Sequence, residues 1–158
     1  MWFIKRTAFL GRGLITSCVA EARRLTSISR LEDMTSSLRL TNDESITLDL
    51  GCGKDIKNPF GASQCLGLDL TSTGKNVRAW DVVSHGIPYE NNYFDSCTAY
   101  DFIEHVPRVS DQEGNRYPFI SLMNEIYRIL KPGGYFLSHT PAYPAKESFS
   151  DPTHANII

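Results

Sequence analysis

One short segment constrains the fold of this chain more than any other. Residues 46–53 read Ile-Thr-Leu-Asp-Leu-Gly-Cys-Gly, an apolar run that ends in two glycines. A short apolar run bounded by turn residues predicts a strand buried on both faces, as in a parallel sheet. Glycines at the carboxyl end of such a strand permit a sharp turn and let a ligand approach the backbone. Alone, the motif leaves a plain turn and a ligand-binding loop equally open.

Short apolar runs recur after this segment. They predict four further strands, at about 65–70, 77–80, 94–100 and 134–138. Pro59 and Gly61 break the segment 54–64, so an irregular turn or one short helix is expected there instead of a full crossover helix. The pattern predicts a Rossmann-like, doubly wound α/β fold with a mainly parallel sheet of about five strands.

One long helix is predicted over residues 119–130. Its apolar stripe consists of Ile120, Met123, Tyr127 and Leu130, and Ile126 and Ile129 widen it. The turn Lys131-Pro132-Gly133-Gly134 then ends the helix, and the fifth strand follows at once. A helix that leads through a tight turn into a buried strand is half of a βαβ unit.

The composition excludes several classes of function. The chain has 158 residues, enough for one core, and a net charge of -2, which provides no positive field for nucleic acid. No uninterrupted apolar run is long enough to span a membrane. The cysteines form no CxxC pair and predict small buried side chains in a reducing, cytoplasmic compartment: Cys18, Cys52, Cys65 and Cys97. The histidines lack the spacing of a helical metal motif, so no metal site is predicted.

The N-terminal region differs in composition from the rest. Residues 1–31 carry six basic residues and one acid, a balance that overlaps with that of a transit peptide. Apolar residues at gaps of three or four nevertheless predict an amphipathic helix: Ile15, Val19, Ala22, Leu25, Ile28 and Leu31. We therefore expect residues 1–45 to form a helical extension and a loop, with the ligand-binding domain at 46–158.

Two acids extend the pattern begun by the glycine loop. Asp69 ends the second predicted strand, and Asp81 follows the third. A carboxylate at Asp69 can accept hydrogen bonds from both hydroxyls of a ribose, and one at Asp81 can accept from an adenine amino group. Each also has a plainer interpretation, as a solvated strand-end acid and as a turn residue. Following three successive strands in order, the glycine loop and the two acids outline one nucleoside site.

This ordered set resembles the class I S-adenosylmethionine (SAM)-dependent methyltransferases. Residues 87–95 are similar to the stretch before the fourth strand of that family. Residues 100–106, Tyr-Asp-Phe-Ile-Glu-His-Val, are similar to the segment after that strand in small-molecule methyltransferases. Residues 125–134 resemble the helix and turn before the fifth strand. The resemblance covers about residues 46–138.

The resemblance implies SAM as the cofactor and assigns its contacts. Asp49, Gly51 and Gly53 would lie by the methionine part, and Asp69 would hold the ribose. The remaining contacts would be Leu70 against the adenine, Asp81 and Val82 at the adenine edge, Tyr100 through its backbone and Phe102 by packing.

The chain departs from the family in two places. Asp55 stands where a third glycine is common, and Ile158 ends the sequence about twenty residues after the fifth strand. Members of the family usually continue into two more strands. We therefore expect either a fragment or a sheet that ends early, with an exposed edge that needs cover and could support self-association.

Methyl transfer from a sulfonium is an in-line displacement, so the protein mainly aligns nucleophile and methyl group. An oxygen nucleophile would benefit from a base, and His105 is the first catalytic candidate because imidazole titrates near neutral pH. An equally plausible role for His105 is to pack or cap a helix start. Glu104, Asp101 and His139 are weaker candidates. The expected acceptor is a small molecule, a glycan or a lipid precursor, with no nucleic-acid partner.

Two rival functions stay open. A nicotinamide-dependent oxidoreductase would carry a third glycine where Ile56 stands. A non-catalytic or incomplete cofactor-binding module fits the early C-terminus. The tail from Thr140, including Asp151-Pro152-Thr153-His154, would form either a substrate-side loop or a plain surface connection.

Overall fold

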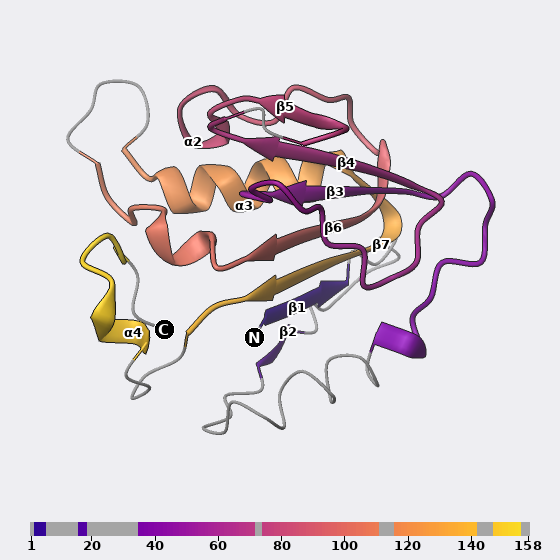
Figure 1. Cartoon of the computed structure of the whole chain (residues 1–158), viewed down its shortest axis with the longest axis horizontal. Coiled ribbons are helices and arrows are strands. Elements are labelled where there is room, and N and C mark those ends of the chain that lie inside the picture. The colour runs from indigo at the N-terminus through magenta and orange to yellow at the C-terminus, as the bar shows by residue number, and fades with distance from the viewer. Residues whose placement is uncertain are drawn as a thin grey trace.

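The computed structural model describes residues 2–5, 16–18, 35–71, 74–110, 116–141 and 147–155. In these ranges the strands form one seven-stranded sheet in the order β2-β1-β7-β6-β3-β4-β5, which Figure 1 shows from bottom to top. The strands are β1 (Trp2–Lys5), β2 (Thr16–Cys18), β3 (Ile46–Leu50), β4 (Gln64–Asp69), β5 (Val77–Ala79), β6 (Phe94–Tyr100) and β7 (Leu130–His139). The helices are α2 (Val82–His85), the 3₁₀ turn η1 (Ile103–His105), α3 (Pro118–Ile129) and α4 (Glu147–Ser150).

The five strands from β3 to β7 pair in parallel, which confirms the predicted Rossmann-like sheet. β3 lies at its centre, between β4 and β6, and its Leu48 and Leu50 are completely buried. Thr47 and Asp49, which alternate with these leucines, are buried as well, so both faces of β3 are covered and buried polar side chains interrupt its apolar run. In a parallel sheet all carboxyl ends meet at one edge, and the loops that follow β3, β4, β5 and β6 therefore lie close together.

Helix α3 confirms the predicted helix and part of its predicted stripe, since Ile126, Ile129 and Leu130 are buried, whereas Ile120 and Tyr127 are not. The side chains that face the core are Leu122, Ile126 and Ile129, whereas Ile120 is 56% exposed and Tyr127 47% exposed. The helix carries apolar residues on more than one side, so periodicity alone could not identify the side that packs against the sheet. The Arg128 guanidinium ties the helix to the segment before β6 by donating to the carbonyls of Ile87 and Tyr89.

The predicted turn at residues 131–134 is a bulge at the start of β7. Leu130 pairs with Phe94, and the next paired residues are Ser96 and Tyr135, so the intervening residues of β7 bulge out of the register. Gly133 has a φ of +86°, a conformation that favours glycine. The Lys131 ammonium forms a 2.8 Å ion pair with Asp95 across the bulge.

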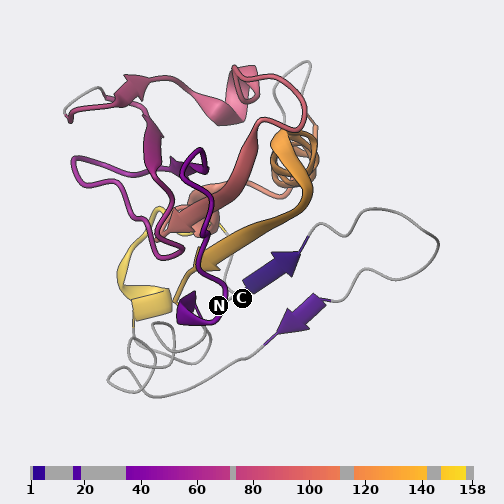
Figure 2. The same cartoon turned by 90° about the vertical axis from the view of Figure 1, so that its right-hand side faces the viewer.

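The prediction of an N-terminal helix is wrong at Thr16–Cys18, which form β2. β2 pairs antiparallel with β1, and β1 pairs antiparallel with β7, Trp2 opposite Ser138. Figure 2 shows this hairpin extending the sheet beyond β7. The free edge expected at β7 is therefore covered, because its unpaired backbone groups find partners in β1. Residues 19–34, which hold most of the predicted helical stripe, lie outside the described residues.

The connection from β3 to β4 contains no helix. Residues 51–63 form turns and irregular backbone, in agreement with the expectation from Pro59 and Gly61. The Asn58 side chain holds this connection in place by bonding in both directions with the backbone of Ala62. Across the described residues, no helix has both the length and the apolar character that a membrane crossing requires.

Candidate cofactor and acceptor site

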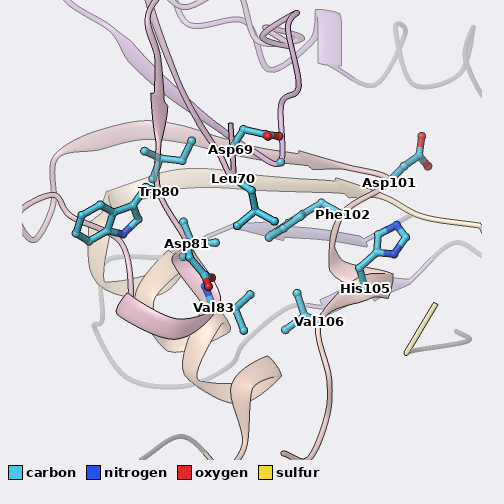
Figure 3. A pocket seen from close by; sticks show the side chains of 12 residues that line it. Asp69, Leu70, Trp80, Asp81, Val83, Asp101, Phe102, His105 and Val106 are labelled. Carbon is cyan, nitrogen blue, oxygen red and sulfur yellow. The ribbon is translucent and has the colours of Figure 1, made fainter. Parts of the chain in front are cut away.

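A pocket of about 420 Å³ opens at the carboxyl ends of β3, β4, β5 and β6. Figure 3 shows Leu70 and Phe102 facing each other in its middle, with Asp101 and His105 together on one side. Its lining is Gly51, Leu68, Asp69, Leu70, Trp80, Asp81, Val82, Val83, Asp101, Phe102, His105 and Val106. We call Gly51, Asp69, Leu70 and Asp81 the glycine-loop end. The histidine end consists of Asp101 and His105, with Glu104 and His154 behind them.

The glycine loop needs glycine for two different reasons. Gly51 and Gly53 have φ values of +63° and +58°, which side chains rarely adopt. A Cβ on Gly51 would in addition lie 2.5 Å from the ring of Phe102, so this ring packs directly on the loop. Around Gly53 the space that a Cβ would fill is open. The loop therefore presents a bare stretch of backbone that a ligand can approach.

Asp69 links the end of β4 to the glycine loop. Its Oδ2 accepts a hydrogen bond of 2.9 Å from the Gly53 amide, and its Oδ1 accepts from the Thr71 amide. A carboxylate has about four lone-pair positions, so acceptor capacity is left for a ligand. The next residue, Leu70, is 74% exposed although it lines the pocket. An exposed leucine beside a carboxylate provides an apolar surface for the flat ring of a base.

Asp81 begins α2 and caps it. Its Oδ1 accepts from the amides of Val83 and Ser84, and its Oδ2 accepts from the Ser84 hydroxyl. Although partial burial opposes them, these hydrogen bonds hold the pKa of Asp81 below its usual value. The carboxylate is thus fixed and charged at the pocket wall. The capping role of Asp81 agrees with its interpretation as a turn residue. Its position on the pocket wall agrees with its interpretation as a ligand contact.

Asp49 lies behind the glycine loop and does not line the pocket. It is only 1% exposed. Its oxygens accept from the Lys57 amide and the Thr98 hydroxyl, both at 2.7 Å. Burial outweighs these hydrogen bonds and raises the pKa of Asp49 to about 6. Its visible role is to anchor the connection that follows the glycine loop.

Asp101 and Tyr100 stand where β6 leaves the sheet. Asp101 has a φ of +49°, an unusual conformation for a residue other than glycine and one often found at functional sites. Its Oδ1 lies 3.2 Å from Nδ1 of His139, and this contact lowers the pKa of Asp101. The Tyr100 ring stacks on the His139 ring outside the pocket lining, and burial raises the pKa of its phenol to about 12.

His105 brings the C-terminal segment to the pocket. Its Nδ1 lies 2.9 Å from the Thr153 hydroxyl, and its ring packs edge-on against that of His154 at 4.9 Å between centroids. The Ala155 amide donates to the Glu104 carbonyl and fixes the segment on η1. In Figure 1 α4 lies at the same side as the carboxyl ends of β6 and β7. The described part of the tail thus contacts the pocket residue His105, although none of its residues lines the pocket itself.

The structure brings together most of the residues singled out from the sequence. Those that line one pocket are Gly51, Asp69, Leu70, Asp81, Val82, Phe102 and His105. Asp49, Gly53 and Tyr100 lie behind or beside it. Sequence reasoning missed Trp80, whose position directly before Asp81 was an available signal, and it named His154 only as a member of the tail segment 151–154. The Trp80 indole donates to the Gly86 carbonyl and carries Arg78 over its ring at 4.6 Å.

The residues present fit an adenosine-type cofactor. The open space beside Gly53 admits a ligand, the two carboxylates are hydrogen-bond acceptors, and Leu70 and Phe102 provide apolar surfaces. A nucleoside with sugar hydroxyls, an amino group and a flat base needs this combination. The backbone after Gly53 does not enter a helix, so no helix N-terminus is available to attract a phosphate. The lack of such a terminus favours a cofactor without phosphate groups.

Comparison with known proteins identifies a family and agrees with the fold. A family model described as a methyltransferase domain matches residues 22–155. The chain belongs to this family of methyltransferase domains. None of the curated proteins compared with the chain matches it.

Two solved structures have a similar fold. One is a SAM-dependent methyltransferase from Archaeoglobus fulgidus, with a TM-score of 0.58 and 20% identity over 82% of this chain and 60% of that one. The other is the [4+2]-cyclase SpnF, with a TM-score of 0.52 and 19% identity over 76% of this chain and 47% of that one. This chain thus spans about half to three fifths of the length of these proteins. At such identities the likeness concerns the fold alone.

Proposed function

We propose that the chain binds SAM in this pocket and transfers its methyl group to an oxygen atom of a small-molecule, glycan or lipid-precursor acceptor. The observation that carries the proposal is the convergence of Gly51, Asp69, Leu70 and Asp81 on one pocket at adjacent strand ends. Membership of the methyltransferase-domain family supports the same cofactor.

The glycine-loop end would hold the cofactor. Asp69 would accept hydrogen bonds from the ribose hydroxyls, and Asp81 from the adenine amino group. Leu70 and Phe102 would enclose the base between apolar surfaces, while the bare backbone of the glycine loop would face the methionine part. When bound, SAM supplies a methyl group activated by its sulfonium. The task of the chain is to hold that group in line with the acceptor oxygen.

His105 is suited to take the proton of the acceptor. The Thr153 hydroxyl donates to Asp151 at 2.6 Å, so its oxygen is free to accept from Nδ1–H of His105. With Nδ1 used in that hydrogen bond, Nε2 is the nitrogen of His105 that can accept a proton. A base at this position would accept the acceptor's proton as the new bond to carbon forms. The neighbouring Asp101 carboxylate would stabilise the imidazolium that results.

The proposal is tested by cofactor binding and turnover. Calorimetry of the full chain should detect binding of SAM and none of NAD. Formation of S-adenosylhomocysteine, measured by mass spectrometry with a panel of hydroxylated acceptors, should then accompany methylation. NAD binding in place of SAM would favour the oxidoreductase alternative instead.

A second outcome separates an enzyme from a binding module. The cyclase SpnF has a similar fold, so the fold by itself does not fix the reaction. Tight SAM binding without S-adenosylhomocysteine formation from any acceptor, including those in a cell extract, would support a non-catalytic module. In that case the methyl-transfer part of the proposal would be rejected and the cofactor part retained.

A further inference from the structure

Glu104 is a buried acid without a cationic partner. It is 1% exposed, and neither carboxylate oxygen makes a hydrogen bond of good geometry. Burial raises the pKa of this acid, and the nearby Thr140 hydroxyl opposes that rise. No described lysine or arginine forms an ion pair with it. Burying an ionised carboxylate in this way is costly unless a cation compensates its charge. The surroundings of Glu104 therefore show what that cation could be.

Two imidazoles meet this carboxylate. One nitrogen from each of His105 and His154 and one oxygen of Glu104 all lie within 4.8 Å of one another. Atoms bound to one tetrahedral Zn²⁺ ion at about 2.1 Å lie about 3.4 Å apart, so the farthest pair would need to close by up to about 1.4 Å. Two histidines and one glutamate form a known ligand set for divalent transition metals, with a position left for a further ligand.

Hydrogen bonds prepare both imidazoles for a cation. Nδ1 of His154 lies 3.1 Å from the Ser148 carbonyl, and Nδ1 of His105 lies 2.9 Å from the Thr153 hydroxyl. A carbonyl can only accept, and the Thr153 hydrogen is directed to Asp151. Both rings are therefore placed to donate from Nδ1, which leaves Nε2 as the nitrogen that can face a metal ion. Metal-binding histidines are oriented by outer hydrogen bonds of this kind.

The charges around the cluster also favour a cation. The Asp151 carboxylate lies 4.0 Å from Nε2 of His154, and Asp101 stands beside His105 on the pocket wall. Asp101 and Asp151 thus add two acidic groups beside the Glu104, His105 and His154 cluster. We propose that Glu104, His105 and His154 bind one divalent transition-metal ion, with Zn²⁺ as the simplest occupant, at the histidine end of the pocket.

The position of this site would allow a bound ion to act on the methyl acceptor. His105 lines the pocket, so an ion bound to it would lie beside the space for the methyl acceptor. The acceptor oxygen would be its remaining ligand, and the ion would lower the pKa of that hydroxyl. This second step rests on the proposed function, whereas metal binding itself does not. With the ion bound, the Nε2 lone pair of His105 would hold the metal instead of a proton.

The test is a titration of the full chain with Zn²⁺, followed by calorimetry, and with Co²⁺, followed by its visible absorption. We expect one equivalent of metal to bind, and Glu104→Gln and His154→Gln each to weaken binding at least about tenfold. His85→Gln is the matched control, because this histidine lies in α2 and outside the cluster. Circular dichroism would establish that each variant is folded.

The outcomes are separable. No binding by the unaltered chain, or equal binding in the Glu104→Gln, His154→Gln and His85→Gln variants, would overturn the metal site. If Glu104→Gln does not fold, metal binding by the His154→Gln variant, whose substitution lies on the C-terminal segment, decides whether the site exists. SAM binding without metal binding would reject this inference and leave the proposed function intact. Metal binding without SAM binding would reject the proposed function and leave the metal site intact.

Discussion

The two ends of the pocket are built in different ways. The glycine-loop end uses residues that directly follow three strands of one sheet, so backbone geometry alone brings them together. The histidine end joins His105 after β6 to Thr153 and His154, which lie nearly fifty residues later in the chain. The first end is a property of the fold, whereas the second is specific to this chain. Cofactor chemistry should therefore reside at the first and acceptor chemistry at the second.

The largest expected effect comes from the histidine end. His105→Gln removes the imidazole and should lower kcat by about 10²–10⁴-fold, the range for a lost acid–base group. SAM affinity should stay within about threefold, which is less than 1 kcal/mol. Turnover and calorimetry on the same preparation measure both quantities, with His85→Gln as the control. If His105→Gln also weakened SAM binding to a similar extent, the assignment of cofactor binding to one end and acceptor chemistry to the other would be wrong.

The next effect concerns the stability of the glycine-loop end. Gly51→Ala introduces a Cβ at 2.5 Å from Phe102 and places a side chain at a φ of +63°. We expect the free energy of unfolding to fall by about 2–5 kcal/mol. Gly53→Ala is the matched variant, because its φ is similar but its surroundings are open, and it should cost only about 1–2 kcal/mol. Urea denaturation that gives equal losses would contradict the role assigned to the Phe102 contact.

Asp49 predicts a dependence of stability on pH. Its pKa is raised from 3.8 to about 6, so the folded chain favours the protonated acid. Its contribution to stability is complete below about pH 4 and is lost as the pH rises through 6. Asp49→Asn has no such titration. The free energy of unfolding of the variant, relative to that of the unaltered chain, should therefore rise by roughly 2–3 kcal/mol between pH 4 and pH 7. The measurement is the free energy of unfolding of both proteins at several pH values in that range. If the two free energies changed with pH in the same way, the assignment would be wrong.

The smallest expected effect tests the cofactor contact itself. Asp69→Ala removes the proposed ribose acceptor and should weaken SAM binding by about 1–3 kcal/mol, the range for unpaired buried donors. Asp55→Ala removes the same charge from an exposed position of the same loop and should leave binding unchanged. Calorimetry on both folded variants makes the comparison. Unchanged affinity in Asp69→Ala would remove Asp69 from the cofactor site.

The sequence was most informative where local patterns determine structure. The five parallel strands could be predicted because their burial makes them continuously apolar, and the glycine-loop end could be predicted because it follows from strand ends. The side of α3 that faces the core could not be predicted, because Ile120 and Tyr127 fit the apolar periodicity as well as Leu122 and Ile126 do. Only the sheet decides which of them it covers.

Two features depend on contacts that no local pattern encodes. β1 forms because β7 offers an unpaired edge, a condition set by residues far along the chain. The cluster of Glu104, His105 and His154 likewise forms only when the C-terminal segment folds back onto η1. The sequence spacing of the histidines predicted no metal site, since helical metal motifs place their ligands within one or two turns.

The pairing of β1 with β7 also has a consequence for the order of folding during synthesis. Trp2 is made before its partner Ser138, which follows about 130 residues later and takes on the order of ten seconds more at typical rates. Throughout that interval β1 has no β7 to pair with. The edge of this sheet is therefore completed by a strand that is made well before its partner.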